Sequence, residues 1–218
     1  MRKSQVALAL LASLTSFTTV VHADTSLLTA SASSSFTQTV TPDSITYSFT
    51  GLTLAGFEFL QVAANSSAPV WGTLTSVSVN ATLDASVNYT YGDDLTIYVK
   101  ALPLASGGPL QVGGFSDTGA LERHSWSNGG SSAPGTTVID TVMLDTPLTF
   151  SGSASDPIIW LGNGYGSSDT EGTWSGSITL TGLSTVAPVP EPASFALMAL
   201  GGLGMVGWVS RRRRHMAV

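Results

Sequence analysis

The segment between residues 24 and 187 offers few groups that could act in nucleophilic or acid–base catalysis. His124 is its only histidine, and it lies in the polar run Glu122-Arg123-His124-Ser125-Trp126. A serine hydrolase would need this base and a Gly-x-Ser-x-Gly turn, which does not occur. We therefore interpret His124 as an exposed loop residue and expect that the chain is not an enzyme. A carboxylate pair for glycoside hydrolysis stays open, because the spatial separation of the two groups decides that chemistry.

Metal binding would have to rely on oxygen ligands. The chain has no cysteine, which excludes zinc–thiolate sites and disulfides. Calcium prefers about six to eight oxygen ligands, and the candidates at turn-like positions are Asp93, Asp94, Asp169 and Glu171. No EF-hand loop is present, so the alternative is that these carboxylates are solvated turn residues. The cofactor prediction is therefore none, with structural calcium as the open alternative.

Four tryptophans lie between residues 24 and 187, and their sequence contexts differ. Trp160 and Trp174 lie in strand-like runs, so we assign them to the core. Trp71 and Trp126 lie next to turn-like segments. These two could stack on sugar rings, or they could cap one end of the fold.

A chemically distinctive segment lies near the C-terminus. Val189-Pro190-Glu191-Pro192 places one carboxylate between prolines, which fix φ and keep the backbone extended, as a protease cleft requires. Residues 193–209 follow without a charge. As a helix they would span roughly 26 Å, near the lower limit for crossing a bilayer. We predict a single transmembrane helix here; a buried amphipathic helix is disfavoured because the run has no polar face.

The charges that flank this run indicate the topology. A basic cluster follows it, made of Arg211, Arg212, Arg213 and Arg214. It is expected to stop transfer and to keep that end in the cytoplasm, because cationic residues remain on the cytoplasmic side of a span. The predicted arrangement is therefore a single pass through the membrane with the N-terminus outside.

Residues 1–23 read as a secretory signal peptide. Arg2 and Lys3 precede a short apolar run, and Val21-His22-Ala23 places small residues where signal peptidase reads them. We expect cleavage between Ala23 and Asp24. An uncleaved anchor is the alternative, but threonines and serines interrupt the apolar run early.

The order of Pro-Glu-Pro, apolar stretch and arginine cluster over residues 188–214 closely resembles a PEP-CTERM sorting signal. The resemblance implies recognition by an exosortase, a membrane-embedded cysteine transpeptidase of Gram-negative bacteria. It also implies a final location at the cell surface or in the extracellular matrix, often together with exopolysaccharide and biofilm. Such tails are sometimes catalogued as ice-binding; that role would need a flat threonine array, and no Thr-x-Thr repeat of fixed period occurs.

The elements that carry these residues are predicted from hydrophobic periodicity. Apolar residues alternate with polar ones at Ile45, Tyr47 and Phe49, on odd positions from Val77 to Tyr91, and again from Leu95. Such alternation indicates strands with one buried face, and glycine- and serine-rich turns separate the runs. We expect an all-β, antiparallel, jelly-roll-like β-sandwich over residues 24–187.

Two short segments agree with this fold. Tyr91-Gly92-Asp93-Asp94-Leu95-Thr96-Ile97 resembles a strand of proprotein-convertase P-like domains, and Gly172-Thr173-Trp174-Ser175-Gly176-Ser177-Ile178 is similar to their closing strand. These domains are jelly rolls, so the resemblance implies the same class of fold.

The charge balance limits the partners. Residues 24–187 carry 13 acidic residues but only two basic ones, Lys100 and Arg123. A nucleic-acid partner is excluded, because phosphate neutralisation needs a basic face. We expect an exported, exosortase-sorted surface protein with a structural or matrix role; the alternatives are a carbohydrate- or calcium-binding module and, third, a hydrolase.

Overall fold

A computed structural model of the chain describes residues 20–21, 35–64, 69–100, 107–166 and 169–188. The predicted cleavage site, the Pro-Glu-Pro segment, the helix at 193–209 and the arginine cluster lie outside the described residues. None of the helices in the described ranges is long and apolar enough to cross a membrane.

The regular secondary structure of the described residues is almost entirely β-strand. The elements are β1 (Val20–Val21), β2 (Ser35–Val40), β3 (Ser44–Ala55), β4 (Phe59–Ala63), β5 (Trp71–Val87), the 3-10 helix η2 (Gly92–Asp94), β6 (Leu95–Val99), β7 (Leu110–Val112), β8 (Glu122–His124), β9 (Thr136–Ser151), β10 (Ile159–Asn163) and β11 (Glu171–Ser184). The prediction that the domain over residues 24–187 is all-β is confirmed for the residues that the structure describes.

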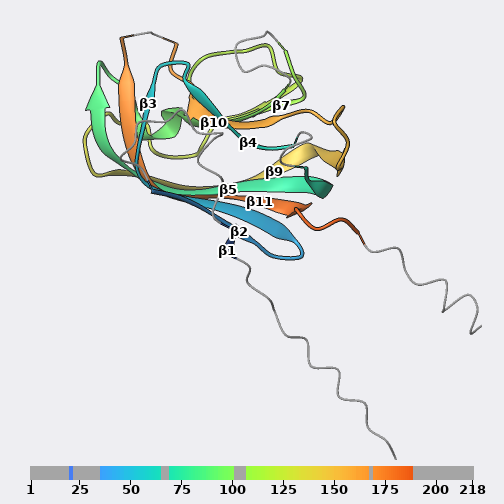
Figure 1. Cartoon of the computed structure of the whole chain (residues 1–218). Coiled ribbons are helices and arrows are strands. Elements are labelled where there is room, and N and C mark those ends of the chain that lie inside the picture. The colour runs from blue at the N-terminus through green and yellow to red at the C-terminus, as the bar shows by residue number, and fades with distance from the viewer. Residues whose placement is uncertain (1–19, 22–34, 65–68, 101–106, 167–168, 189–218) are drawn as a thin grey trace, which may run out of the picture. The chain divides into compact units, whose positions relative to one another are not determined.

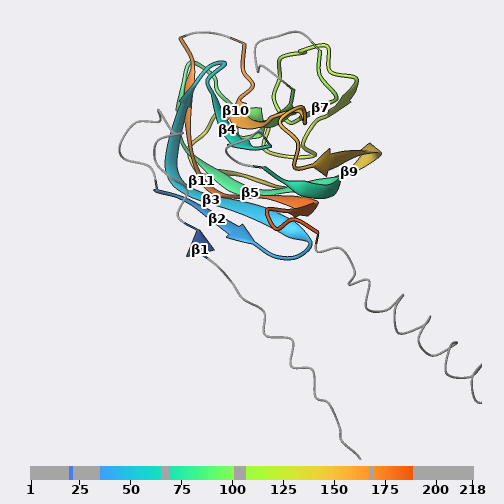
Figure 2. The same cartoon turned by 45° about the vertical axis from the view of Figure 1, so that its right-hand side comes forward.

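The strands form two sheets. One has six strands in the order β1-β2-β3-β11-β5-β9, and the other has five in the order β4-β10-β6-β7-β8. Figures 1 and 2 show β4, β7 and β10 above the layer formed by β2, β5, β9 and β11. This arrangement is consistent with the predicted sandwich, but it is not wholly antiparallel, because β7 and β8 pair in parallel.

Alternating burial explains why these segments form strands. In β3, Ile45, Tyr47 and Phe49 are buried, while Thr46 and Ser48 between them are half-buried. The central strand β11 pairs with β3 on one side and with β5 on the other, so Ile178 lies between Tyr47 and Val79. Each fully buried side chain of this kind contributes roughly 1.5–3 kcal/mol.

The second sheet is buried on both faces at its centre. All five residues of β6 are buried, including the polar Thr96 and the aromatic Tyr98. Thr96 donates a hydrogen bond to the Asp94 carbonyl oxygen, and Gly114 and Gly164 pack directly against its side chain. The loops that follow β7 and β10 therefore cover the outer face of this sheet.

One predicted strand is too long. Period two holds from Val77 to Leu83 but ends before Tyr91, because Val87 and Tyr89 are exposed and the strand stops at Val87. Asn88 and Tyr89 have positive φ angles of 52° and 65°, so the chain turns there. The alternation of apolar and polar residues in the sequence therefore continues beyond the end of β5, through the turn at Asn88 and Tyr89.

Candidate functional site

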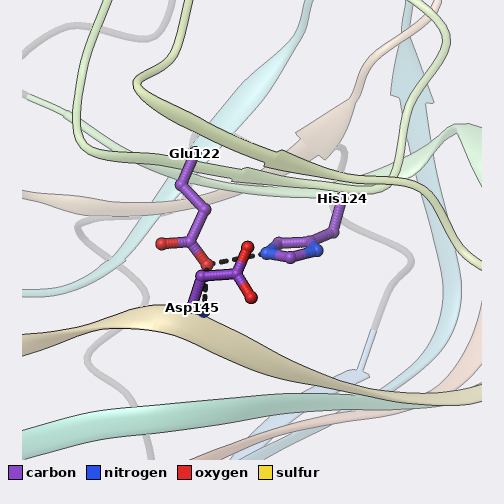
Figure 3. A group of neighbouring side chains, drawn as sticks. All are labelled: Glu122, His124 and Asp145. Carbon is purple, nitrogen blue, oxygen red and sulfur yellow. Dashed lines mark hydrogen bonds and ion pairs between the residues drawn. The ribbon is translucent and has the colours of Figure 1, made fainter.

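Three titratable side chains from two different sheets meet beside β8 (Figure 3). Glu122 and His124 are two positions apart on β8, so period two places both side chains on the same face. Asp145 comes from β9 in the other sheet. The candidate ligand atoms of the three residues all lie within 4.8 Å of one another.

Glu122 is the centre of this group. Its Oε1 lies 2.6 Å from Nε2 of His124 and accepts a hydrogen bond from the Asp145 amide at 2.7 Å. Its Oε2 accepts from the Thr146 amide at 3.0 Å. Burial by itself would raise the pKa of Glu122, but these hydrogen bonds outweigh it and hold the pKa below its ordinary value. The carboxylate therefore stays ionised at neutral pH and ties β8 to β9.

The interpretation of His124 as an exposed loop residue is wrong. His124 lies in a strand, and its side chain is only 22% exposed. A three-residue strand is too short to show periodicity, and Asp145, the third member of the group, lies on a different strand far along the chain. The sequence therefore carried no signal for this contact.

The calcium candidates fall into two places. Asp93 and Asp94 belong to η2, where the Asp94 carboxylate accepts a hydrogen bond from the Tyr91 amide at 2.7 Å. Asp169 is exposed and interacts with Asn88, and Glu171 begins β11. Over the described ranges, only the Glu122–His124–Asp145 group brings three such residues within ligand distance of one another.

The acidic pair of η2 lines a cavity of about 230 Å³, together with Phe115, Arg123 and Trp126. Burial, the largest effect, raises the pKa of Asp94 to about 6; the Tyr91 amide lowers it, and the charge of Asp93 raises it further. Asp94 is thus a carboxyl group whose protonation changes near neutral pH.

The burial of the tryptophans differs in part from what the sequence predicted. Trp174 is fully buried as expected, and Trp160 is half-buried, with its Nε1 donating to the Lys100 carbonyl at 2.8 Å. Trp126 is only 5% exposed and donates from Nε1 to the Leu95 carbonyl at 2.7 Å, so its ring is not free to stack on a sugar. Trp71 packs against Gly152.

The outer face of the six-stranded sheet carries rows of hydroxyl groups. One row crosses five strands in register and consists of Thr39, Thr46, Thr179, Ser78 and Thr141. Thr46 and Thr179 hydrogen-bond at 2.9 Å, and Thr141 donates to Ser78 at 2.9 Å. An open hollow of about 230 Å³ lies over Ser78, Thr141, Thr179 and their neighbours. The sequence shows no threonine repeat of fixed period, because each residue of this row comes from a different strand and only the strand register brings them together.

Comparison with known proteins concerns the C-terminal segment. A family model described as the PEP-CTERM protein-sorting motif matches residues 188–214. The chain carries a PEP-CTERM sorting signal. The match includes the predicted motif from Val189 to Pro192 and the arginines from Arg211 to Arg214. A PEP-CTERM signal indicates an extracellular protein that an exosortase sorts, with export and membrane association before processing.

The PEP-CTERM match covers only this terminal segment and begins after the last strand of the β domain, β11. Neither the curated proteins nor the solved structures contain a match to the chain.

Proposed function

We propose that the chain is a non-enzymatic β-sandwich protein of the Gram-negative cell surface or extracellular matrix, with a structural role there. The PEP-CTERM match over residues 188–214 is the observation that carries this proposal. A signal peptide at 1–23 would direct export and be removed, and a membrane span at 193–209 would hold the chain in the membrane until the exosortase acts. The processed protein would then reach the surface without its arginine cluster.

Glu191→Ala tests the sorting step. The substitution removes the only charge of Val189-Pro190-Glu191-Pro192 and leaves the following apolar run unchanged. In a host with the exosortase, we expect the wild-type protein to end near Pro192, and we expect the variant to keep its tail while still inserting. Mass spectrometry of the C-terminus measures both results. Glu171→Ala, which removes an exposed carboxylate of the β domain, is the matched control and should be processed normally.

Processing of Glu191→Ala as complete as that of the wild type would contradict the sorting proposal. So would native protein from such a host that keeps residues up to Val218. In either case the tail would act as a plain membrane anchor.

A second candidate function is binding of exopolysaccharide by the β domain, which the hydroxyl row on the six-stranded sheet favours. Each hydroxyl offers one donor and two acceptors, so the rows can hydrogen-bond a polyhydroxylated chain. Thr39 and Thr141 lie on the first and last strands of the row, and adjacent strands are about 4.8 Å apart. The hollow over the row supplies a place where a chain of sugars could lie.

Thr179→Val tests this binding, because it removes one hydroxyl of the row and keeps the β-branched shape. We expect weaker co-sedimentation of the full-length chain with exopolysaccharide from a producing strain. Thr146→Val is the control, since Thr146 lies on β9 outside the row. Equal retention of both variants and the wild type would remove the support for this second function.

A further inference from the structure

The group formed by Glu122, His124 and Asp145 has a composition that suits a metal ion. It offers one imidazole nitrogen and two carboxylates, with the ligand atoms within 4.8 Å of one another. Figure 3 shows the three side chains pointing toward one another from β8 and β9. Mixed nitrogen and oxygen ligands of this kind favour divalent first-row transition ions. Calcium is disfavoured, because it takes oxygen ligands only.

The charges around the group favour a cation. The Glu122 carboxylate accepts hydrogen bonds from two backbone amides, those of Asp145 and Thr146, and such hydrogen bonds favour its charged form. No hydrogen bond of the Asp145 carboxylate to any of the described residues is seen, so its oxygens are available to a ligand. Arg123, the basic residue between Glu122 and His124, donates to the carbonyl oxygens of Gly114 and Phe115 and is thus engaged elsewhere.

The fold holds the Glu122 carboxylate of this group in place before any metal ion binds. Two backbone amides, those of Asp145 and Thr146, hold the Glu122 carboxylate in place at 2.7 and 3.0 Å. Hydrogen bonds of this type orient a ligand before the metal binds. The side chains of His124 and Glu122 are 22% and 11% exposed, and Asp145 is exposed, so an ion can enter from solvent.

We propose that Glu122, His124 and Asp145 bind a divalent first-row transition metal ion, for which zinc is the test case. Zinc bonds to nitrogen and oxygen are about 2.0–2.2 Å long, which requires ligand atoms roughly 3–3.5 Å apart. The 2.6 Å contact between Nε2 of His124 and Oε1 of Glu122 would open by less than about 1 Å. His124 binds the ion as a neutral imidazole, with its N–H on Nδ1, and the Nε2 atom that faces Glu122 gives its lone pair to the ion.

Binding would join the edges of the two sheets. β8 is the last strand of the five-stranded sheet, and β9 is the last strand of the six-stranded sheet. An ion held by residues of both strands binds only the folded state, so it should raise the melting temperature. A zinc concentration about 100 times the dissociation constant should raise it by roughly 5–10 °C in a chain of this size.

The test uses the full-length chain, freed of metal with a chelator and titrated with zinc chloride. Calorimetry should find one zinc site, and thermal unfolding should show the rise in melting temperature. His124→Ala and Asp145→Asn should both lose at least about tenfold in zinc affinity, the loss expected when a metal ligand or its supporting residue is removed. Asp145→Asn is the milder change, because it keeps the size of the side chain and the backbone amide that holds Glu122. Cobalt chloride should give a visible spectrum that disappears in His124→Ala.

His215→Ala is the matched control, since it removes another histidine outside this group. It should keep the zinc-induced rise in melting temperature. The proposal is overturned if zinc causes no rise in the wild type, if His124→Ala keeps the full rise, or if the rise disappears in His215→Ala. An equal rise with calcium chloride also overturns it, because the imidazole would then have no role.

Discussion

At the scale of single residues, burial makes Asp94 an unusual carboxyl group. Asp94 is 1% exposed, and burial raises its pKa to about 6 from an ordinary value of 3.8. The folded state therefore holds a proton on Asp94 over a pH range in which the unfolded chain has already lost it. By linkage, the free energy of unfolding falls as the pH rises from about 4 to about 6.

We predict that Asp94→Asn removes this pH dependence. Asparagine is neutral and keeps an oxygen that can accept from the Tyr91 amide. The variant should gain stability over the wild type as the pH rises from 4 to 7, by up to about 3 kcal/mol, because one pKa unit corresponds to about 1.4 kcal/mol. Urea unfolding of the full-length chain at both pH values measures the difference.

Asp156→Asn supplies a control of opposite sign. Burial by itself would raise the pKa of Asp156, but hydrogen bonds from Ser151 and Ser153 outweigh burial and lower this pKa below its ordinary value. Asp156 therefore stabilises the fold above its ordinary pKa, and this contribution is lost as the pH falls. Asp156→Asn should cost stability at pH 7 and less at low pH. If Asp94→Asn showed the same trend as Asp156→Asn, the raised pKa of Asp94 would be refuted.

At the scale of elements, β11 depends on a glycine at the point where its register with both neighbours is irregular. Gly176 has a φ of 149°, and it lies next to a register shift in the pairing with β3 and close to one in the pairing with β5. A Cβ built at Gly176 would overlap the Asn80 carbonyl oxygen and the Ala81 Cα. Only glycine can therefore occupy this place in the sheet.

We predict that Gly176→Ala destabilises the chain by at least about 2 kcal/mol more than Gly51→Ala. Gly51 also has a positive φ, of 62°, but no heavy atom lies within 4 Å of a Cβ built there. Gly51→Ala should cost only the backbone term of roughly 1–2 kcal/mol, whereas Gly176→Ala adds a clash that the sheet must absorb. Chemical denaturation measures both, and equal losses would show that the clash is relieved.

Side chains protect the exposed backbone of β9, which is an edge strand of its sheet. Side chains satisfy the backbone groups that would otherwise face a neighbouring strand: Asn128 bonds both the amide and the carbonyl of Ile139, and Glu122 binds the amides of Asp145 and Thr146. Pro147 has no amide hydrogen to offer. Covered edges of this kind prevent pairing with other chains.

We predict that Asn128→Ala increases self-association of the full-length chain. The substitution frees the amide and carbonyl of Ile139, next to the exposed side chains of Ile139 and Met143. Light scattering against concentration measures the change. Asn88→Ala is the control, because Asn88 is exposed and bonds Asp169 rather than an edge strand. Association no greater than in this control would argue against the role of Asn128.

At the scale of the whole molecule, charge is divided along the chain. Residues 24–187 have 13 acidic and two basic residues, and Arg211 to Arg214 form the basic cluster beyond the apolar run. This division predicts that the acidic domain is exported and that the arginines stay in the cytoplasm. β1 lies inside the predicted signal peptide, so its removal would leave β2 as an edge of the sheet.

We predict the following topology for the unprocessed chain. A reporter fused after Val218 should be active only in the cytoplasm, and a reporter inserted between Ser132 and Ala133 should be active only outside. The insertion point lies in an exposed connection between β8 and β9, which can accept an added domain. Activity of the two reporters on the opposite sides would overturn the orientation.

The amino-acid sequence by itself determined those features that depend on neighbouring residues. The sorting signal is linear, so its order was readable directly, and the family match to residues 188–214 agrees with it. Strands such as β3 were predictable because period two reports a buried face over several residues. Prediction of β5 was correct only to Val87, since positive φ angles at Asn88 and Tyr89 leave no mark in the hydrophobic pattern.

Only the tertiary structure decided the features that join distant residues. The contact of Glu122 and His124 with Asp145, the burial of Trp126 and the hydroxyl row from Thr39 to Thr141 all depend on which strands are neighbours and in what register. Strand register is set by the packing of the whole core, because a shift of one residue would expose every buried side chain of that strand. That packing is a property of the folded chain and cannot be read from any one segment of the sequence.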